Sequence, residues 1–182
     1  MEEQWYTITG GIDVNTAHNL ITYLNGQIYG SNIKKLKIII SSTGGDVDSA
    51  IRIYSYLKAV PLDIETIAFS QIDSAANIIY VAGSKRIAIK GCRFFLHEGT
   101  FTTGAQTTTL HNHEESLLIF RELLKKHVGI LSKETGKKEE EIAKLLNEST
   151  ILTPEKAKEL GLVHEVLEKF PLTRQTPNIN NN

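Results

Sequence analysis

A serine and a histidine stand where each could take part in nucleophilic catalysis. Ser74 follows a strand predicted over residues 64–69 and begins a short apolar helix predicted over residues 74–82. A serine at such a strand-to-helix turn is exposed at the edge of a sheet, as in the nucleophile elbow of many hydrolases. The Gly-x-Ser-x-Gly string of that elbow is absent here, and a simple helix N-cap would explain Ser74 as well.

His97 ends a strand predicted over residues 93–96. Open α/β sheets place their ligands at the carboxyl ends of the strands, which is where this imidazole is expected. A neutral imidazole there could accept the hydroxyl proton of Ser74 as a general base. A histidine satisfied within the core is the competing interpretation.

Two glycines, Gly44 and Gly45, follow a strand predicted over residues 36–41. Glycine allows the backbone to approach a ligand closely. The N–H groups of this turn, together with that of Ala75, could stabilise a negative oxygen that develops during acyl transfer. An ordinary strand-to-helix turn is the alternative explanation for the glycine pair.

The first half of the chain alternates strands with helices, which predicts a largely parallel sheet of the α/β class. The first helix is expected to be capped by Asp13 or Asn15 and to run to about Gln27. The expected strands cover residues 5–9, 36–41, 64–69, 86–89 and 93–96, and the expected helices between them cover residues 46–57 and 74–82.

A long helical pattern over about residues 107–135 dominates the second half. Its apolar positions recur mostly every three or four residues, at Leu110, Leu117, Phe120, Leu124, His127 and Leu131. At 1.5 Å per residue the helix would be roughly 40 Å long, so we expect it to project from the domain or pack against another chain. Shorter helices over residues 138–146 and from Thr153, and a strand over 162–167, complete one domain of residues 1–170. The polar tail 171–182 is expected to be disordered.

The composition limits the kinds of partner and the cellular location that are expected for the protein. The chain has 182 residues, a net charge of −1 and a single cysteine, Cys92. This balance gives no sign of a nucleic-acid or membrane partner, and the apolar runs are too short to span a bilayer. The start of the chain lacks a signal-peptide pattern, so we expect a cytoplasmic protein.

Five segments together resemble the proteolytic subunit of the Clp protease, a family with the ClpP/crotonase fold. The family's Asn-Ser-Pro-Gly-Gly is similar to residues 41–45, Ser-Ser-Thr-Gly-Gly. Its Gly-Gln-x-x-Ser-x-x-Ala resembles residues 70–77, and its Arg-x-x-x-His-Gln-Pro resembles residues 93–99. Its handle helix is similar to residues 107–135, and its closing helix and strand to residues 153–164.

The resemblance implies a serine peptidase that cleaves peptides or unfolded proteins through an acyl-enzyme. Ser74 would be the nucleophile, His97 the general base, and Gly45 and Ala75 the oxyanion hole. The resemblance implies no metal and no organic cofactor. It also implies a ring-forming homo-oligomer whose handle helices interdigitate between rings, and an ATP-driven unfoldase as partner. Because the chain begins close to its first strand, docking of such an unfoldase is not expected here.

The sequence departs from the family pattern at the third triad position, where the aspartate is replaced by Ser149. Glu148 after a one-residue slip, or Asn147, could replace it, whereas Asp73 is too close to the nucleophile in sequence to face the imidazole. Ser70 replaces the elbow glycine, and Glu98-Gly99 replaces Gln-Pro.

Two other functions compete with the peptidase. The missing aspartate favours a catalytically impaired structural subunit or scaffold, and the shared fold allows a crotonase-type acyl-CoA enzyme. A metal site at His111 and His113 is not expected, because residues two apart on a helix do not face each other.

Overall fold

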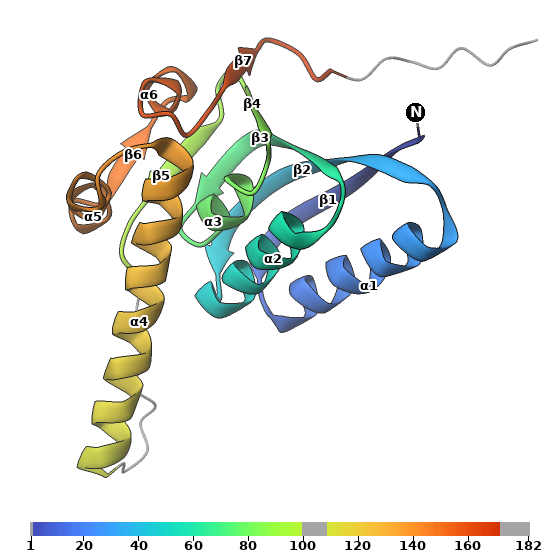
Figure 1. Cartoon of the computed structure of the whole chain (residues 1–182). Helices are drawn as coiled ribbons and strands as arrows, with labels where there is room; N and C mark the ends of the chain where they lie inside the picture. Colours follow the sequence, from blue (N-terminus) through green and yellow to red (C-terminus); the bar gives the residue numbers. More distant parts are fainter. Residues whose placement is uncertain (1, 100–108, 172–182) are drawn as a thin grey trace, which may run out of the picture.

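The computed structural model describes residues 2–99 and 109–171 (Figure 1). The first half alternates strands and helices as predicted: β1 (Glu2–Ile12), α1 (Val14–Gly30), β2 (Ile33–Gly45), α2 (Val47–Ala59), β3 (Asp63–Asp73), α3 (Ala76–Tyr80), β4 (Lys85–Ile89) and β5 (Arg93–Leu96). The second half is mainly helical: α4 (Leu110–Thr135), α5 (Glu139–Asn147), β6 (Thr150–Leu152), α6 (Pro154–Glu159) and β7 (Glu165–Leu167).

The described strands form one seven-stranded sheet in the order β1-β2-β3-β4-β7, with β5 beside β3 and β6 beside β5. All pairs are parallel except β5 with β6, which is antiparallel. This arrangement confirms the predicted α/β fold with a mostly parallel sheet. The short strand β6 was not predicted from the sequence.

Strand β3 changes its neighbour halfway along. Its first half pairs with β4, as at Ala68 and Ala88, and its second half pairs with β5, as at Asp73 and Phe95. Between the halves, Ser70 adopts a left-handed φ of 65°, and the register against β2 shifts at the same place. The kink at Ser70 therefore directs the end of β3, and the residue that follows it, toward β5.

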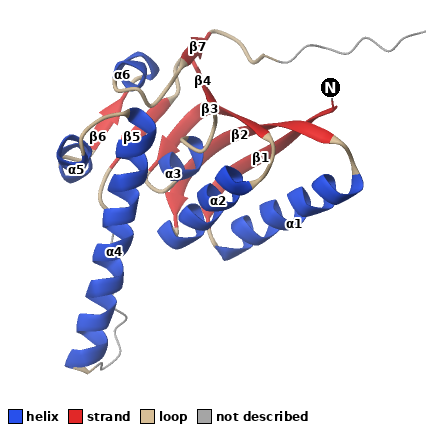
Figure 2. Cartoon of the chain, viewed as in Figure 1, coloured by secondary structure: helices blue, strands red, loops and turns tan. Residues whose placement is uncertain are grey.

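Helices α1, α2 and α3 lie against the sheet and form the core with it (Figure 2). Asp13 caps α1 as one of the two predicted candidates, since its carboxylate accepts the Thr16 N–H at 2.7 Å. The three helices bury apolar residues against the sheet, α1 and α2 beside β1 and α3 beside β2 and β3. The buried residues include Leu20, Leu24, Ile53, Leu57, Ile78 and Ile79. Burying such side chains away from water is the main stabilisation of the sheet that carries the site.

Helix α4 projects from the body at its N-terminal end, as Figure 1 shows. His127 and Leu131 near its C-terminal end are buried, whereas Leu110 and Leu118 are 74% and 61% exposed. The predicted apolar stripe is thus covered by the body only over its second half. No helix in residues 2–99 or 109–171 is both long enough and apolar enough to cross a membrane.

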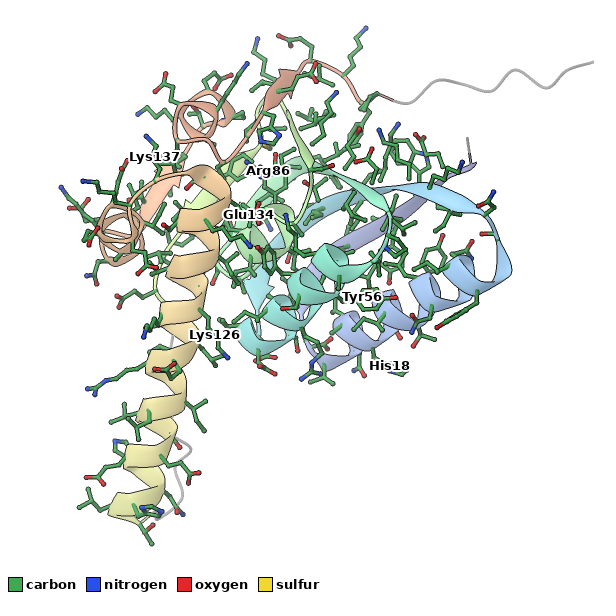
Figure 3. All side chains as sticks on the ribbon, in the orientation of Figure 1. His18, Tyr56, Arg86, Lys126, Glu134 and Lys137 are labelled. Atoms are coloured by element: carbon green, nitrogen blue, oxygen red, sulfur yellow. The ribbon has the colours of Figure 1, made fainter. Side chains whose placement is uncertain are left out.

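Arg86 fixes the buried end of α4 to the sheet (Figure 3). Its side chain is almost fully buried, and it donates to the carbonyl oxygens of Glu134, Gly161 and Leu162, each at 2.9 Å. The Glu134 carboxylate in turn accepts the Tyr54 hydroxyl at 2.6 Å. One guanidinium thus joins α4, the segment after α6 and strand β4.

Arg86→Met is expected to lower the free energy of unfolding by about 3 kcal/mol, because it leaves the carbonyl oxygens of Glu134, Gly161 and Leu162 without their donor. Denaturant unfolding measures the effect. Lys85→Met is the control, since the neighbouring Lys85 side chain is half exposed and pairs with Glu165 at the surface. Equal stability losses in the two variants would contradict this assignment.

Candidate active site

Ser74 lies in a strained turn between β3 and α3. It is 8% exposed and has a left-handed φ of 55°, a conformation that costs a non-glycine residue about 1–3 kcal/mol. Its N–H donates to the Phe95 carbonyl at 2.8 Å, which ties the turn to β5. A serine held in such a left-handed turn between a strand and a helix is the backbone geometry expected of a nucleophile elbow.

The buried side chain of Asn77 stabilises this turn by hydrogen bonds, a role that was not predicted from the sequence. Its side-chain amide is fully buried and donates to the carbonyls of Ser74 at 3.0 Å, Phe95 at 3.0 Å and Ile72 at 3.2 Å. The only sequence signal was an asparagine inside an otherwise apolar helix. These bonds fix the backbone on both sides of the Ser74 side chain.

The glycine turn between β2 and α2 presses against the elbow. Gly44 has φ +84°, and a Cβ on it would come within 2.7 Å of the Ser74 Cβ and 3.0 Å of the Ala75 nitrogen. Gly45 has φ +145°, and its own Cβ would reach 2.8 Å from the Ile12 nitrogen. Gly44 is therefore required for this turn to reach the Ser74–Ala75 peptide, and Gly45 for the turn to lie against Ile12 of β1.

His97 extends beyond β5 next to the elbow. Its half-buried imidazole stacks on the Phe95 ring, with 4.5 Å between ring centroids and 19° between planes. The next residue, Glu98, donates its N–H to the Leu146 carbonyl at 3.2 Å and so joins this segment to α5. Within the described residues, neither the Ser74 hydroxyl nor the His97 imidazole makes a side-chain hydrogen bond.

A cleft of about 340 Å³ brings three of the predicted site residues together. Ser74, His97 and Gly45 line it, and Thr43 and Asp46 add further polar groups. Its apolar wall is formed by Val47 of α2 and by Phe120 and Leu123 of α4. Ala75 is fully buried directly behind Ser74.

Comparison with known proteins decides the family. The Clp protease family profile matches residues 1–170. The chain belongs to the Clp protease family. This membership favours the Clp interpretation of the fold over the acyl-CoA alternative.

Relatives of this Clp-family chain include two bacterial subunits. The ATP-dependent Clp protease proteolytic subunit 2 of Frankia casuarinae is 34% identical over 137 residues, which cover 74% of the chain and 62% of that protein, less than two thirds of its length. Subunit 1 of Thermobifida fusca is 30% identical over 91% of the chain and 75% of that protein. A solved ClpP1 point mutant from Listeria monocytogenes has the same fold, with a TM-score of 0.80 at 22% identity over 91% of both chains.

The candidates for the third triad position lie near His97 in the Clp-family chain but are exposed. Ser149 directly precedes β6. Its neighbour Thr150 pairs with Leu96, the residue before His97, so Ser149 and His97 follow each other at the end of this antiparallel pair. Asn147 ends α5, and the exposed Glu148 carboxylate lies 3.8 Å from Lys144. The Asp73 carboxylate is engaged elsewhere, by Arg93 at 2.7 and 3.2 Å.

No group of three or more metal-ligating side chains occurs in the part of the chain that the structure describes. His111 is exposed on the projecting end of α4.

His127 of α4 is a buried titratable group beside this site. It is 1% exposed, and its Nε2 has no hydrogen-bond partner among the described residues. Burial, and secondarily the nearby His97, lowers the pKa of His127 from 6.5 to about 4. The imidazole is therefore neutral at pH 7.

The depressed pKa of His127 predicts a loss of stability in acid. Between pH 6.5 and 4 the unfolded chain binds a proton there that the folded chain does not, so the free energy of unfolding falls as the pH falls. Relative to pH 7, this one group should cost about 2 kcal/mol at pH 5.

Urea unfolding at pH 7 and pH 5 measures this loss. His127→Met should be less acid-sensitive than wild type by that amount, while His111→Met, at an exposed position of the same helix, should behave like wild type. The prediction is wrong if His127→Met keeps the full acid sensitivity.

Proposed function

We propose that this Clp-family chain is a serine peptidase that hydrolyses peptide bonds through an acyl-enzyme. Ser74 acts as nucleophile, His97 as general base, and the N–H groups of Gly45 and Ala75 as the oxyanion hole. The observation that supports this most is the strained elbow at Ser74, which shares one cleft with His97 and Gly45.

In the proposed reaction, His97 accepts the Ser74 hydroxyl proton as the oxygen attacks the peptide carbonyl carbon. The proton then passes to the leaving amine, and water hydrolyses the acyl-enzyme with His97 again as base. Because the imidazole rests on the Phe95 ring, it must first rotate toward Ser74. The apolar side chains Val47, Phe120 and Leu123 would hold the substrate residue before the cleaved bond.

The wider setting is part of the proposal. The printed names of the relatives describe proteolytic subunits of an ATP-dependent protease. By analogy with them, we propose that this chain forms a ring-shaped homo-oligomer that acts on peptides or unfolded proteins in the cytoplasm. The exposed leucines at the projecting end of α4 support its burial against other copies, because such side chains gain stability when removed from water. Binding of an ATP-driven unfoldase would require that the assembly present a suitable docking surface.

A catalytically impaired structural subunit is the second candidate. It is favoured by the exposure of Asn147, Glu148 and Ser149, and by the engagement of Asp73 with Arg93. Among the described residues, His97 therefore has no buried carboxylate partner. In a serine protease, loss of the aspartate's function lowers turnover roughly 10⁴-fold.

A fluorophosphonate probe distinguishes the two candidates. Native protein at pH 8 is expected to form one covalent adduct, which mass spectrometry should locate on the peptide that contains Ser74. Urea-denatured protein is the control and should not react, because the hydroxyl is then unactivated. Absence of an adduct on the native oligomer between pH 6 and 9 would favour the structural subunit.

A further inference from the structure

Helix α4 carries His127 on the same face that lines the cleft. Phe120, Leu123 and His127 are spaced by three and four residues, so their side chains lie along one stripe of the helix. Phe120 and Leu123 form part of the wall of the cleft, and one turn further His127 is almost fully buried. The stripe thus runs from the cleft into the protein behind it.

The segment after β5, which carries His97, runs beside α4 in the opposite direction (Figure 1). Gly99 lies against Phe120, since a Cβ on it would come within 3.6 Å of that ring. Two residues back along extended chain cover at most about 7 Å, and the seven helical residues from Phe120 to His127 rise about 10 Å. His97 can therefore lie at the level of the last turn before His127, and its charge is the second cause of the lowered His127 pKa.

His127 has an unused hydrogen-bonding atom at this place. Its Nε2 is buried and has no partner among the described residues. Buried polar atoms are nearly always paired, and an exception in a native protein calls for an explanation such as a catalytic role. The predicted candidates for the third triad position, Asn147, Glu148 and Ser149, are exposed.

We propose that His127 is a positioning residue that replaces the missing triad carboxylate. When His97 turns from Phe95 toward Ser74, its Nδ1–H donates a hydrogen bond to the Nε2 lone pair of His127. This bond keeps the His97 Nε2 free of a proton and pointed at the Ser74 hydroxyl. The inference rests on the proposed peptidase function, because it assigns a role within that reaction.

Electrostatics agree with this role. A buried neutral imidazole can accept one hydrogen bond, and the depressed pKa of His127 keeps it neutral at the pH of the reaction. Because it carries no charge, it orients His97 without stabilising the imidazolium as a carboxylate would. The expected catalyst is slower than one with an aspartate but faster than one with no partner.

Two variants at this position test the proposal through the rate of fluorophosphonate labelling of Ser74 in the intact oligomer. His127→Met keeps a similar volume without an acceptor and should slow labelling at least about tenfold, which is part of the roughly 10²–10⁴-fold that a positioned acid–base group contributes. His127→Gln restores an acceptor oxygen and should recover most of the rate. Leu131→Met, one turn further along the helix, is the packing control and should label like wild type.

Ring ¹⁵N chemical shifts of His97 give a second readout that needs no activity. Wild type should show the Nδ1–H tautomer, and His127→Met should shift His97 toward Nε2–H, the form that predominates in a free neutral imidazole. An unchanged tautomer in His127→Met, or equal labelling rates for the Met and Gln variants, overturns the proposal. If wild type fails to label while the tautomer does shift, the peptidase function fails and the His97–His127 hydrogen bond stands.

Discussion

Ser74→Ala is expected to abolish fluorophosphonate labelling and to lower peptide hydrolysis at least about 10⁴-fold. The variant removes the only atom that would form the acyl-enzyme. It should leave the fold intact, because alanine keeps the Cβ and the Ser74 hydroxyl makes no hydrogen bond among the described residues. Cleavage of a fluorogenic peptide library, together with the far-UV circular dichroism spectrum, measures both parts.

Ser70→Ala is the matched control for this experiment. Ser70 and Ser74 lie four residues apart, and both adopt left-handed φ angles, of 65° and 55°. Both substitutions therefore have the same backbone strain before and after the change. Ser70→Ala should keep wild-type activity, and a comparable loss in the two variants would show that the turn, and not the Ser74 hydroxyl, matters.

Gly44→Ala is expected to lower the free energy of unfolding by about 4 kcal/mol, the largest stability loss predicted for this protein. One part is the strain of a left-handed alanine, and the other is a clash of the new Cβ with backbone that cannot rotate away. That Cβ would lie 2.6 Å from the Asp73 carbonyl oxygen and 2.7 Å from the Ser74 Cβ. Relief of the clash must displace the elbow, so Ser74 labelling should be lost as well.

Gly10→Ala separates the strain from the clash. Gly10 has the same φ of +84°, but a Cβ there would meet nothing within 4 Å. It should lose only about 1 kcal/mol and retain Ser74 labelling. Thermal unfolding and probe labelling compare the two variants. Equal losses in Gly44→Ala and Gly10→Ala would contradict the proposed contact.

The helices and strands could be predicted because the sequence signals for them are local. The alternation of strands and helices, the Asp13 cap and the end of the long helix before Gly136 all depend on neighbours within a few residues. The pair Ser74 and His97 came from the same kind of signal, each at the end of a predicted strand. Their meeting in one cleft follows from the parallel pairing of β3 with β5.

What could not be predicted depends on contacts between distant segments. Strand β6 has only three residues and exists because β5 pairs with it. In the sequence, His127 was one member of an apolar helical stripe, and its unpaired nitrogen becomes evident only once α4 lies beside the segment after β5. Arg86 likewise gave no signal, because its partners Glu134 and Gly161 follow it by 48 and 75 residues.

The left-handed backbone at Ser74 makes the residue best for stability different from the residue needed for catalysis. Glycine fits a φ of 55° without steric cost, so Ser74→Gly should make the fold more stable while removing the nucleophile. A laboratory population selected only for survival at high temperature should therefore accumulate glycine at this codon early. The same population kept under a requirement for proteolysis should retain serine, and the contrast between the two lineages would reveal which demand has shaped the chain.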